Sequence, residues 1–349
     1  MTYDYFSDLK IIKHPDKIKE LFESGDSFPI MAEIDPTNAC NFNCYYCCDR
    51  EINKDRKSLP KTRAFTLIDE LCAKNLKSVV IKGGGEPLIS PYVEEYLKHI
   101  HSKGLDIGII TNGSNIPETL CRTICATSKW IKISLDAGTE KTHTEMHRPL
   151  NGPVFDKVLS NIEKLVGMRG KNGSGLTIGV NFTINEINYP EIVLATDLVK
   201  KIGVDYILLK IMVFEERGVS GDLFRKRRNQ TEKLIKEAQK LATGDFHVFF
   251  RDLKNADKGW KKCLFNPFIT IICANGDVYP CCHTKGRKGY LYGNILDNSF
   301  LDVWKGALRK EVYRKCVNKE CLKYCSFRYT GHNRILNYIF EEQPHENFI

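Results

Sequence analysis

The chain lacks any long apolar segment. No stretch of about 18 consecutive apolar residues occurs in its 349 residues, so the sequence predicts no membrane-spanning helix. The N-terminal segment MTYDYFSDLKIIKHPDKIKE also lacks the apolar core of a secretory signal, and we therefore expect a cytoplasmic protein. Thiols stay reduced in that compartment, which excludes a disulfide framework from the prediction.

What the chain has in excess is cysteine and positive charge. It contains 14 cysteines, and 52 Lys and Arg against 43 Asp and Glu give a formal net charge of +9. A balance of 42% hydrophobic and 27% charged residues excludes a disordered or fibrous chain. Cysteines in a reducing compartment are interpreted as metal ligands, with some buried thiols among them. Two groups stand out, four cysteines within residues 40–48 and seven within residues 263–325.

Part of the positive charge is concentrated in RKRRNQTEK at 225–233, which is expected to open a helix. This segment is either a solvated helix end or a basic rim that attracts an anionic substrate, such as a phosphorylated sugar, a nucleotide or an acidic peptide. No nucleic-acid-binding module is visible in the sequence, so we expect no nucleic-acid partner.

Short runs rich in Ile and Val alternate with amphipathic segments over residues 28–214. The runs are largely unbroken, as in strands that are buried on both faces of a parallel sheet. The expected strands are 28–35, 78–85, 104–114, 130–138, 176–185 and 204–214. The expected helices are 65–75, 91–104, 116–128, 154–168 and 191–203. The alternation predicts a parallel α/β domain, either an open sheet or an incomplete barrel, with its site at the carboxyl ends of the strands.

The pattern changes from about residue 250. FITIICANGDVYPCC consists of two β-rich runs around Asn275-Gly276, a dipeptide that predicts a type I′ hairpin. Residues 289–296 predict a further strand and residues 299–315 a helix. We therefore expect an N-terminal extension at 1–27, an α/β domain at 28–245 and a small cysteine-rich α+β domain at 246–349.

The first cysteine group has the spacing of a metal site. Cys40, Cys44 and Cys47 follow the pattern Cys-x3-Cys-x2-Cys in a loop after the first expected strand. Three thiolates from one short loop can bind three irons of a cubane cluster, which leaves the fourth iron open to a substrate or cofactor. A structural zinc site would normally have four ligands. Cys48 follows Cys47 directly and cannot easily point the same way, so we do not expect it to be a ligand.

This loop resembles that of the radical S-adenosylmethionine (SAM) superfamily, whose members share the spacing and have an aromatic residue, here Tyr46, before the third cysteine. The resemblance implies a partial (β/α)6 TIM-like barrel, SAM, a SAM-binding [4Fe-4S] cluster, and an electron donor such as flavodoxin or ferredoxin. In this family an electron from the cluster cleaves SAM to methionine and a 5′-deoxyadenosyl radical, and the radical abstracts a substrate hydrogen.

A glycine-rich turn supports this resemblance. Gly84, Gly85 and Glu86 precede Pro87 and resemble the family's GGEP motif, which lines the amino group of SAM. Glycines let a backbone approach a ligand closely, and a carboxylate suits an ammonium group. Without the cysteine loop about 40 residues upstream, the same turn would be read as an ordinary strand–helix connection.

Further residues follow the fourth and later strands. Ser134 and Asp136 resemble a Ser-x-Asp segment that contacts SAM, and Arg148 resembles the arginine that pairs with the SAM carboxylate through a bidentate fork. Asn112 and Asn181 reach either the ribose, the substrate or only local backbone groups. The histidines at 143 and 147 share one helical face, but the sequence places no third metal ligand near them.

The second cysteine group resembles the SPASM/Twitch extension of radical SAM enzymes. Its first half, with 12 residues from Cys263 to Gly276 and four more to Cys281, matches the family pattern. The second half has too few cysteines for two protein-ligated clusters. The resemblance therefore implies one auxiliary [4Fe-4S] cluster, with the ligands Cys263, Cys281, Cys321 and Cys325. Cys316 is the main alternative ligand, followed by Cys273 and Cys282, and a structural four-cysteine zinc site is the alternative reading.

We expect a radical SAM enzyme of the oxidoreductase or epimerase type that acts on a carbohydrate- or nucleotide-type small molecule. Modification of a ribosomal peptide, by epimerisation or crosslinking, is the alternative reaction. It is less favoured because only 39 residues precede the first cysteine and 24 follow the last, too few for an appended peptide-recognition domain. A non-enzymatic iron–sulfur or zinc binding protein is the alternative of another class.

Overall fold

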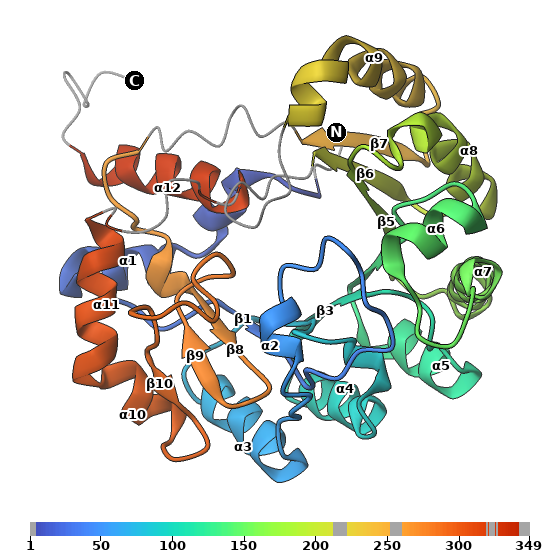
Figure 1. Cartoon of the computed structure of the whole chain (residues 1–349). Coiled ribbons are helices and arrows are strands. Elements are labelled where there is room, and N and C mark those ends of the chain that lie inside the picture. Colours follow the sequence, from blue (N-terminus) through green and yellow to red (C-terminus); the bar gives the residue numbers. More distant parts are fainter. Residues whose placement is uncertain are drawn as a thin grey trace. The chain divides into compact units, whose positions relative to one another are not determined.

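The computed structural model describes residues 5–211, 222–251, 260–318, 320, 325 and 327–341, without the side chains of 222–226 and 327–328. The chain divides into two compact units, each of which is described by itself (Figure 1). The larger unit comprises Ile34–Phe65 and Val79–Leu253. The smaller unit comprises Met1–Glu33, Thr66–Ser78 and Lys254–Ile349.

A sheet of parallel strands, β2 to β7, forms the framework of the larger unit, and β1, of which only Ile34 belongs to that unit, precedes β2 in the strand order. The strands lie next to one another in chain order, and β3 to β7 pair in parallel. Their bounds are β1 Met31–Ile34, β2 Ser78–Ile81, β3 Asp106–Thr111, β4 Trp130–Ser134, β5 Thr177–Ile184, β6 Tyr206–Ile211 and β7 His247–Arg251. Among the described strands no pairing closes this sheet, which confirms the predicted incomplete barrel.

Burial explains why the strand predictions hold and where they fail. All residues of β5 after the first are buried, as expected of an apolar strand that is covered on both faces. The six predicted strands are therefore confirmed as β1 to β6. The sequence did not predict β7, whose residues are all only partly buried and which pairs with β6 alone at the edge of the sheet.

Helices alternate with these strands, as predicted. Their bounds are α2 Arg50–Asn53, α3 Lys61–Cys72, α4 Val93–Ser102, α5 Glu118–Thr127, α6 Glu140–His147, α7 Phe155–Asn172, α8 Ile192–Ile202 and α9 Asp222–Gln239, with short 3-10 turns η2 Pro87–Ile89 and η3 Tyr189–Glu191. Glycines at 173 and 203, with φ of 60° and 93°, end α7 and α8. The basic segment 225–233 lies in α9, and its side chains before Arg227 are outside the described residues. None of the described helices combines the length and apolar character needed to cross a membrane.

The smaller unit combines antiparallel strands with helices. Its strands follow the order β10-β9-β8. Their bounds are β8 Ile269–Ile272, β9 Asp277–Tyr279 and β10 Gly293–Asn294. The remaining elements are η1 Asp8–Lys13, α1 Pro15–Ser24, η6 Asn266–Phe268, α10 Phe300–Lys305, α11 Ala307–Val317 and α12 Phe327–Phe340. The single helix predicted at 299–315 is two helices, because Gly306 is extended (φ −64°, ψ 155°) between α10 and α11.

The predicted hairpin exists, but its turn type was wrong. A type I′ turn needs positive φ at both central residues, and here Gly276 has φ 86° whereas Asn275 does not have a positive φ. The N–H of Cys273 donates to the Asp277 carbonyl at 2.9 Å, so the loop contains three residues. A three-residue hairpin loop usually places a glycine in the left-handed region at its last position, and Gly276 meets that requirement.

An ion pair of the buried Arg309 with the partly exposed Asp26 fixes α11, the helix that carries Cys316. Arg309 is fully buried, and its Nη2 donates to the Oδ1 of Asp26 at 2.7 Å. The guanidinium lies over the ring of Trp304, 4.2 Å from its centre. The stretch of chain before β1 therefore anchors the C-terminal helices of the smaller unit.

Candidate functional site

Three thiols are carried by the loop that follows β1. Cys40, Cys44 and Cys47 lie close enough to influence one another's ionisation. Burial, the largest cause, raises the pKa of Cys40 to about 11 and that of Cys44 well above its usual range. Buried thiols keep their protons until a cation replaces them, so the loop is suited to exchange protons for a metal centre.

The C-terminal end of α6 holds this cysteine loop. The backbone N–H of Asn43 donates to the carbonyls of His147 and Arg148, each at 3.1 Å. The N–H of Tyr45 donates to the Met146 carbonyl at 3.2 Å. The last carbonyls of a helix have no partner within the helix, so the loop satisfies them and is fixed by them.

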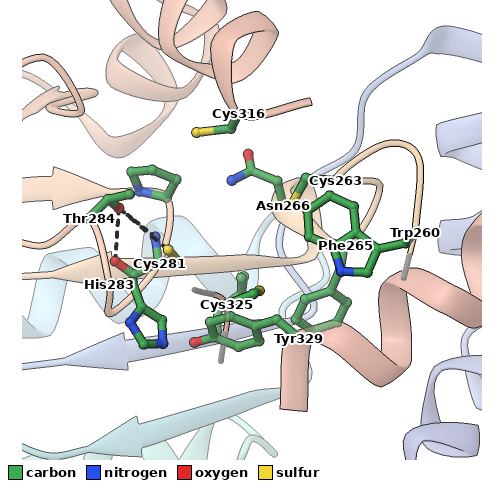
Figure 2. Close-up of a pocket in the computed structure, with 12 residues that line it drawn as sticks. Trp260, Cys263, Phe265, Asn266, Cys281, His283, Thr284, Cys316, Cys325 and Tyr329 are labelled. Atoms are coloured by element: carbon green, nitrogen blue, oxygen red, sulfur yellow. Dashed lines mark hydrogen bonds between the residues drawn. The ribbon is translucent and has the colours of Figure 1, made fainter. Parts of the chain in front are cut away.

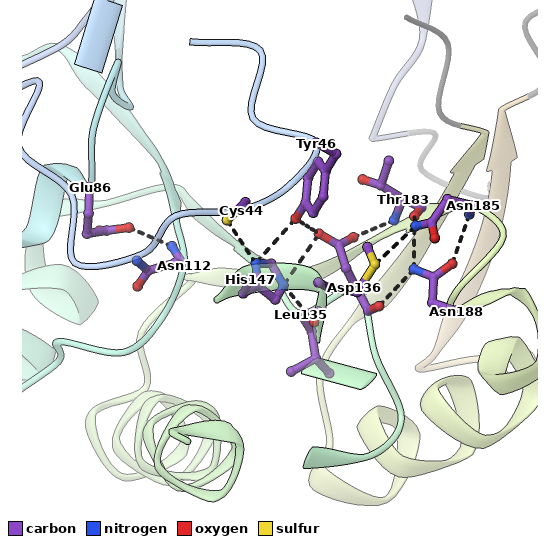
Figure 3. Close-up of polar contacts among 11 residues, drawn as sticks. Cys44, Tyr46, Glu86, Asn112, Leu135, Asp136, His147, Thr183, Asn185 and Asn188 are labelled. Carbon is purple, nitrogen blue, oxygen red and sulfur yellow. Dashed lines mark hydrogen bonds and ion pairs between the residues drawn. The ribbon is translucent and has the colours of Figure 1, made fainter. Parts of the chain in front are cut away.

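Asp136 connects the same loop to the sheet (Figure 3). Its Oδ2 accepts a hydrogen bond from the Tyr46 hydroxyl at 2.5 Å, and its Oδ1 accepts one from the backbone N–H of Thr183 in β5. The Nδ1 of His147 lies 3.3 Å from the Tyr46 hydroxyl and 3.3 Å from the Sγ of Cys44. Burial raises the pKa of Tyr46 and lowers the pKa of His147, so both side chains are neutral at pH 7.

Glu86 connects the ends of β2 and β3. Its Oε1 accepts hydrogen bonds from the Thr111 hydroxyl at 2.6 Å and from the Leu88 N–H at 3.0 Å. Its Oε2 accepts from the Asn112 N–H at 2.7 Å. Burial raises the pKa of Glu86, and these hydrogen bonds oppose the rise. The geometry thus gives Glu86 an anchoring role that the sequence did not indicate.

The two glycines before Glu86 face the segment that leads into the cysteine loop. An added Cβ at Gly85 would lie 2.0 Å from the carbonyl oxygen of Ala39, and one at Gly84 would lie 2.4 Å from the Oδ1 of Asn38. The N–H of Glu86 donates to the same Ala39 carbonyl at 2.9 Å. The close approach that these glycines permit is therefore, in this structure, an approach to Asn38 and Ala39 of the protein itself.

We expect alanine at position 85 to impair the site more than alanine at position 84. The neighbour of Gly85 is a backbone carbonyl that cannot move alone, whereas the neighbour of Gly84 is a side-chain amide that can rotate. Gly85→Ala should lower the free energy of unfolding by about 2–3 kcal/mol and reduce iron binding. Urea unfolding and iron analysis of both variants check this, and equal losses would contradict it.

Ser134, Asn181 and Arg148 offer polar groups to a ligand. Ser134 ends β4 and lies opposite Asn181 of β5. The Oδ1 of Asn181 is buried and has no hydrogen-bond partner among the described residues. Arg148 is exposed, with its guanidinium 5.8 Å from the ring centre of Tyr45. The unpaired acceptor of Asn181 and the hydroxyl of Ser134 suit hydroxyl groups of a ligand, and the exposed cation of Arg148 suits a carboxylate. SAM has both kinds of group.

The second cysteine group lines a cavity in the smaller unit (Figure 2). Four thiols face this space, those of Cys263, Cys281, Cys316 and Cys325. Burial raises the pKa of Cys281 above its usual range. In the described part of the chain no three His, Cys, Asp or Glu side chains are placed to share a single metal ion. The four thiols instead surround a common space, as ligands of a larger cluster would.

The other predicted cysteines are placed differently. Cys321 lies outside the described residues. Cys273 is buried in the apolar core of the smaller unit, and Cys282 packs against that core. Neither lines the cavity, and Cys48 is exposed.

The sequence missed the role of His147. It indicated that this residue shares a helical face with His143, and the two rings do pack at 4.5 Å. It gave no sign that His147 would reach Cys44 and Tyr46, which are about 100 residues away along the chain. The only available signal was its position directly before Arg148.

Comparisons with known proteins find two family domains in the chain. The Radical SAM superfamily model matches residues 34–192, and the SPASM model, an iron-sulfur cluster-binding domain, matches residues 263–327. A relative from Fibrobacter sp. (strain UWH6), an S-adenosylmethionine-dependent nucleotide dehydratase, is 30% identical over 285 residues, which cover 76% of this chain and 80% of the relative. An AdoMet-dependent heme synthase from Methanosarcina barkeri is 27% identical over 318 residues, 84% of this chain and 86% of the relative.

A solved structure supports the fold. Streptococcus suis SuiB bound to the precursor peptide SuiA matches with a TM-score of 0.65 and 18% identity, over 90% of this chain and 73% of that chain. The two matched domains imply SAM and a [4Fe-4S] cluster for residues 34–192, and auxiliary iron–sulfur binding for residues 263–327. The chain therefore belongs to the radical SAM superfamily and carries a C-terminal SPASM domain.

Proposed function

We propose that the chain is an enzyme that cleaves SAM reductively and abstracts a hydrogen atom from a nucleotide- or carbohydrate-type small molecule, which it oxidises or epimerises. The observation that carries the proposal is the cysteine loop, with three partly buried thiols held together after β1 and fixed by α6 and Asp136. When bound, the cluster supplies the electron that converts SAM to methionine and a 5′-deoxyadenosyl radical.

The chain's own residues divide the work of binding and positioning. Cys40, Cys44 and Cys47 hold three irons, which leaves one iron for SAM. Tyr46 fixes the middle of the loop through its hydrogen bond to Asp136. We thus assign Asp136 a positioning role, although the family resemblance implied a direct contact with SAM.

The surrounding residues bind SAM in this proposal. The backbone of Gly84, Gly85 and Glu86 lies against the segment that leads into Cys40. There it would line the site of the amino group of SAM. The hydroxyl of Ser134 would form a hydrogen bond with a hydroxyl group of SAM. The exposed guanidinium of Arg148 is free to pair with its carboxylate.

One auxiliary [4Fe-4S] cluster occupies the cavity of the smaller unit in this proposal. Cys263, Cys281 and Cys325 are three of its ligands, as the sequence predicted, and all three line the cavity. Cys316 lines it too, which favours Cys316 as the fourth ligand among the described residues, with Cys321 as the alternative. Held by these thiols, such a cluster would supply an acceptor for the second electron of a substrate oxidation, and a flavodoxin or ferredoxin would supply the electron for SAM cleavage.

The substrate class rests on the relatives. The 30% identical relative is named as a nucleotide dehydratase, which favours a nucleotide-type substrate. The second candidate is a peptide, because the SuiB structure contains a precursor peptide.

We expect a nucleotide or nucleotide sugar to accelerate SAM cleavage by the reduced, reconstituted protein about tenfold over the rate without substrate. Deuterium placed on the reactive carbon of the substrate should appear in 5′-deoxyadenosine. Mass spectrometry of reactions with a panel of nucleotides, nucleotide sugars and peptides checks this. Acceleration and deuterium transfer with peptides alone would replace the first candidate by the second.

A further inference from the structure

Asn266 is a buried amide at the wall of the cysteine-lined cavity. It is the first residue of η6 and only 4% exposed. Its Oδ1 accepts a hydrogen bond from the hydroxyl of Tyr292 at 2.7 Å. Tyr292 is itself 2% exposed, and burial raises its pKa well above its usual range, so the hydroxyl remains a donor. This bond fixes which way the amide points.

With its oxygen held by Tyr292, the amide directs its nitrogen toward the thiols. Figure 2 shows the Nδ2 of Asn266 facing the space between Cys263, Cys281 and Cys316. This nitrogen carries two N–H donors, and no hydrogen-bond partner is found for either among the described residues. A buried amide seldom leaves both donors unused, because an unmade hydrogen bond costs free energy. The unused donors therefore point to an acceptor that occupies the cavity.

Two other polar groups near these thiols, those of Asn333 and Thr284, are already engaged. The Nδ2 of Asn333 lies 3.6 Å from the Sγ of Cys263 and also donates to the carbonyl of Tyr329. The Oγ1 of Thr284 lies 3.5 Å from the Sγ of Cys281 and also donates to that residue's carbonyl. Asn266 differs from these two residues because no acceptor for its Nδ2 is found among the described residues.

We propose that Asn266, oriented by Tyr292, donates a hydrogen bond to a sulfur of the auxiliary cluster and thereby raises the reduction potential of that cluster. The inference rests on the proposed auxiliary cluster. Reduction adds negative charge, which spreads onto the sulfurs, so an N–H donor stabilises the reduced state more than the oxidised state. Asn266 is a positioning and tuning residue here, and it is not an iron ligand.

The test uses the full chain with Cys40, Cys44 and Cys47 replaced by alanine, so that the auxiliary cluster is observed alone. In this background we compare Asn266→Leu, which keeps the side-chain shape without the donors, with the parent. At a fixed solution potential, the ratio of reduced to oxidised cluster should fall roughly tenfold in Asn266→Leu. For a one-electron couple this corresponds to a reduction potential that is about 59 mV lower. A redox titration followed by electron paramagnetic resonance measures it.

Two further variants make the result specific. Tyr292→Phe leaves the amide in place but removes its anchor, and should shift the potential in the same direction by a smaller amount. Asn298→Leu makes the same substitution at an exposed asparagine of the same unit and should leave the potential unchanged. If Asn266→Leu does not assemble a cluster, the Tyr292→Phe potential decides.

The outcomes distinguish failure of the role of Asn266 from failure of the proposed auxiliary cluster. If Asn266→Leu holds about four irons per chain and its reduction potential is unchanged, the role of Asn266 is overturned and the auxiliary cluster stands. If Asn266→Leu holds no iron, an unchanged potential in Tyr292→Phe, with about four irons, overturns it in the same way. Absence of any cluster from the parent background overturns both. A lowered potential in both variants, with full iron content and an unchanged Asn298→Leu control, supports the inference.

Discussion

Serine at position 47 is expected to abolish SAM cleavage. Cys47 is one of three thiols on the loop after β1, and its loss leaves two ligands for the SAM-binding cluster. Substitution of groups that only surround a metal typically costs 10–100-fold, so loss of a direct ligand should cost more than about 100-fold. Iron should fall from about eight to about four per chain, since the auxiliary cluster is retained. Iron analysis and the rate of 5′-deoxyadenosine formation measure both effects.

Cys48 provides the matched control. It is adjacent in sequence, exposed, and carries the same functional group. Cys48→Ser should keep full iron content and a rate within about twofold of the parent, which lies within the ±0.5 kcal/mol usual for exposed positions. If the two serine variants lose iron equally, the assignment of the three ligands is wrong.

The second large effect concerns stability. Asp136→Ala should lower the free energy of unfolding of the iron-free protein by about 3 kcal/mol, because the Tyr46 hydroxyl and the Thr183 N–H lose their acceptor. Asp136 also has φ 52°, a left-handed conformation that alanine adopts only with strain. Iron binding should fall as well, since the cysteine loop loses its connection to β5. Urea unfolding and iron analysis measure these changes.

Two controls isolate the hydrogen bonds of Asp136. Tyr46→Phe removes one donor, leaves the other, and should cost about 1 kcal/mol. Asp106→Ala removes an exposed carboxylate whose ion pair with Lys129 is 3.8 Å long, and should change stability by less than about 0.5 kcal/mol. An Asp136→Ala protein as stable as the Asp106→Ala protein would show that the network does not hold the loop.

The sequence predicted the framework because its signals are local. Unbroken apolar runs identify β1 to β6, since a strand that is covered on both faces needs apolar residues on both faces. The edge strand β7 was not predicted, because its partly buried residues do not form such an apolar run. The polar helix α6 was not among the predicted helices, although the spacing of His143 and His147 indicated one helical face there. A further signal was the capping side chain of Thr139, which accepts a hydrogen bond from the Thr142 N–H.

The site was predictable only in part, for the same reason. The spacing of Cys40, Cys44 and Cys47 within one loop is a local pattern, and it led directly to the metal site. The hydrogen bond between Tyr46 and Asp136 joins residues that are 90 positions apart. The carboxylate of Glu86 likewise meets Thr111, 25 positions away, where the sequence suggested only a ligand. Such contacts depend on the fold and leave no spacing pattern in the chain.

The most direct test of the proposed SAM cleavage is to identify the products that the reduced, reconstituted protein forms from SAM without any added substrate. We expect 5′-deoxyadenosine and methionine in equal amounts, formed only with reductant and absent with Cys47→Ser. A non-enzymatic iron–sulfur or zinc protein would return SAM unchanged. If a protein that is fully loaded with iron and reduced leaves SAM unchanged, the proposal that this chain cleaves SAM is contradicted.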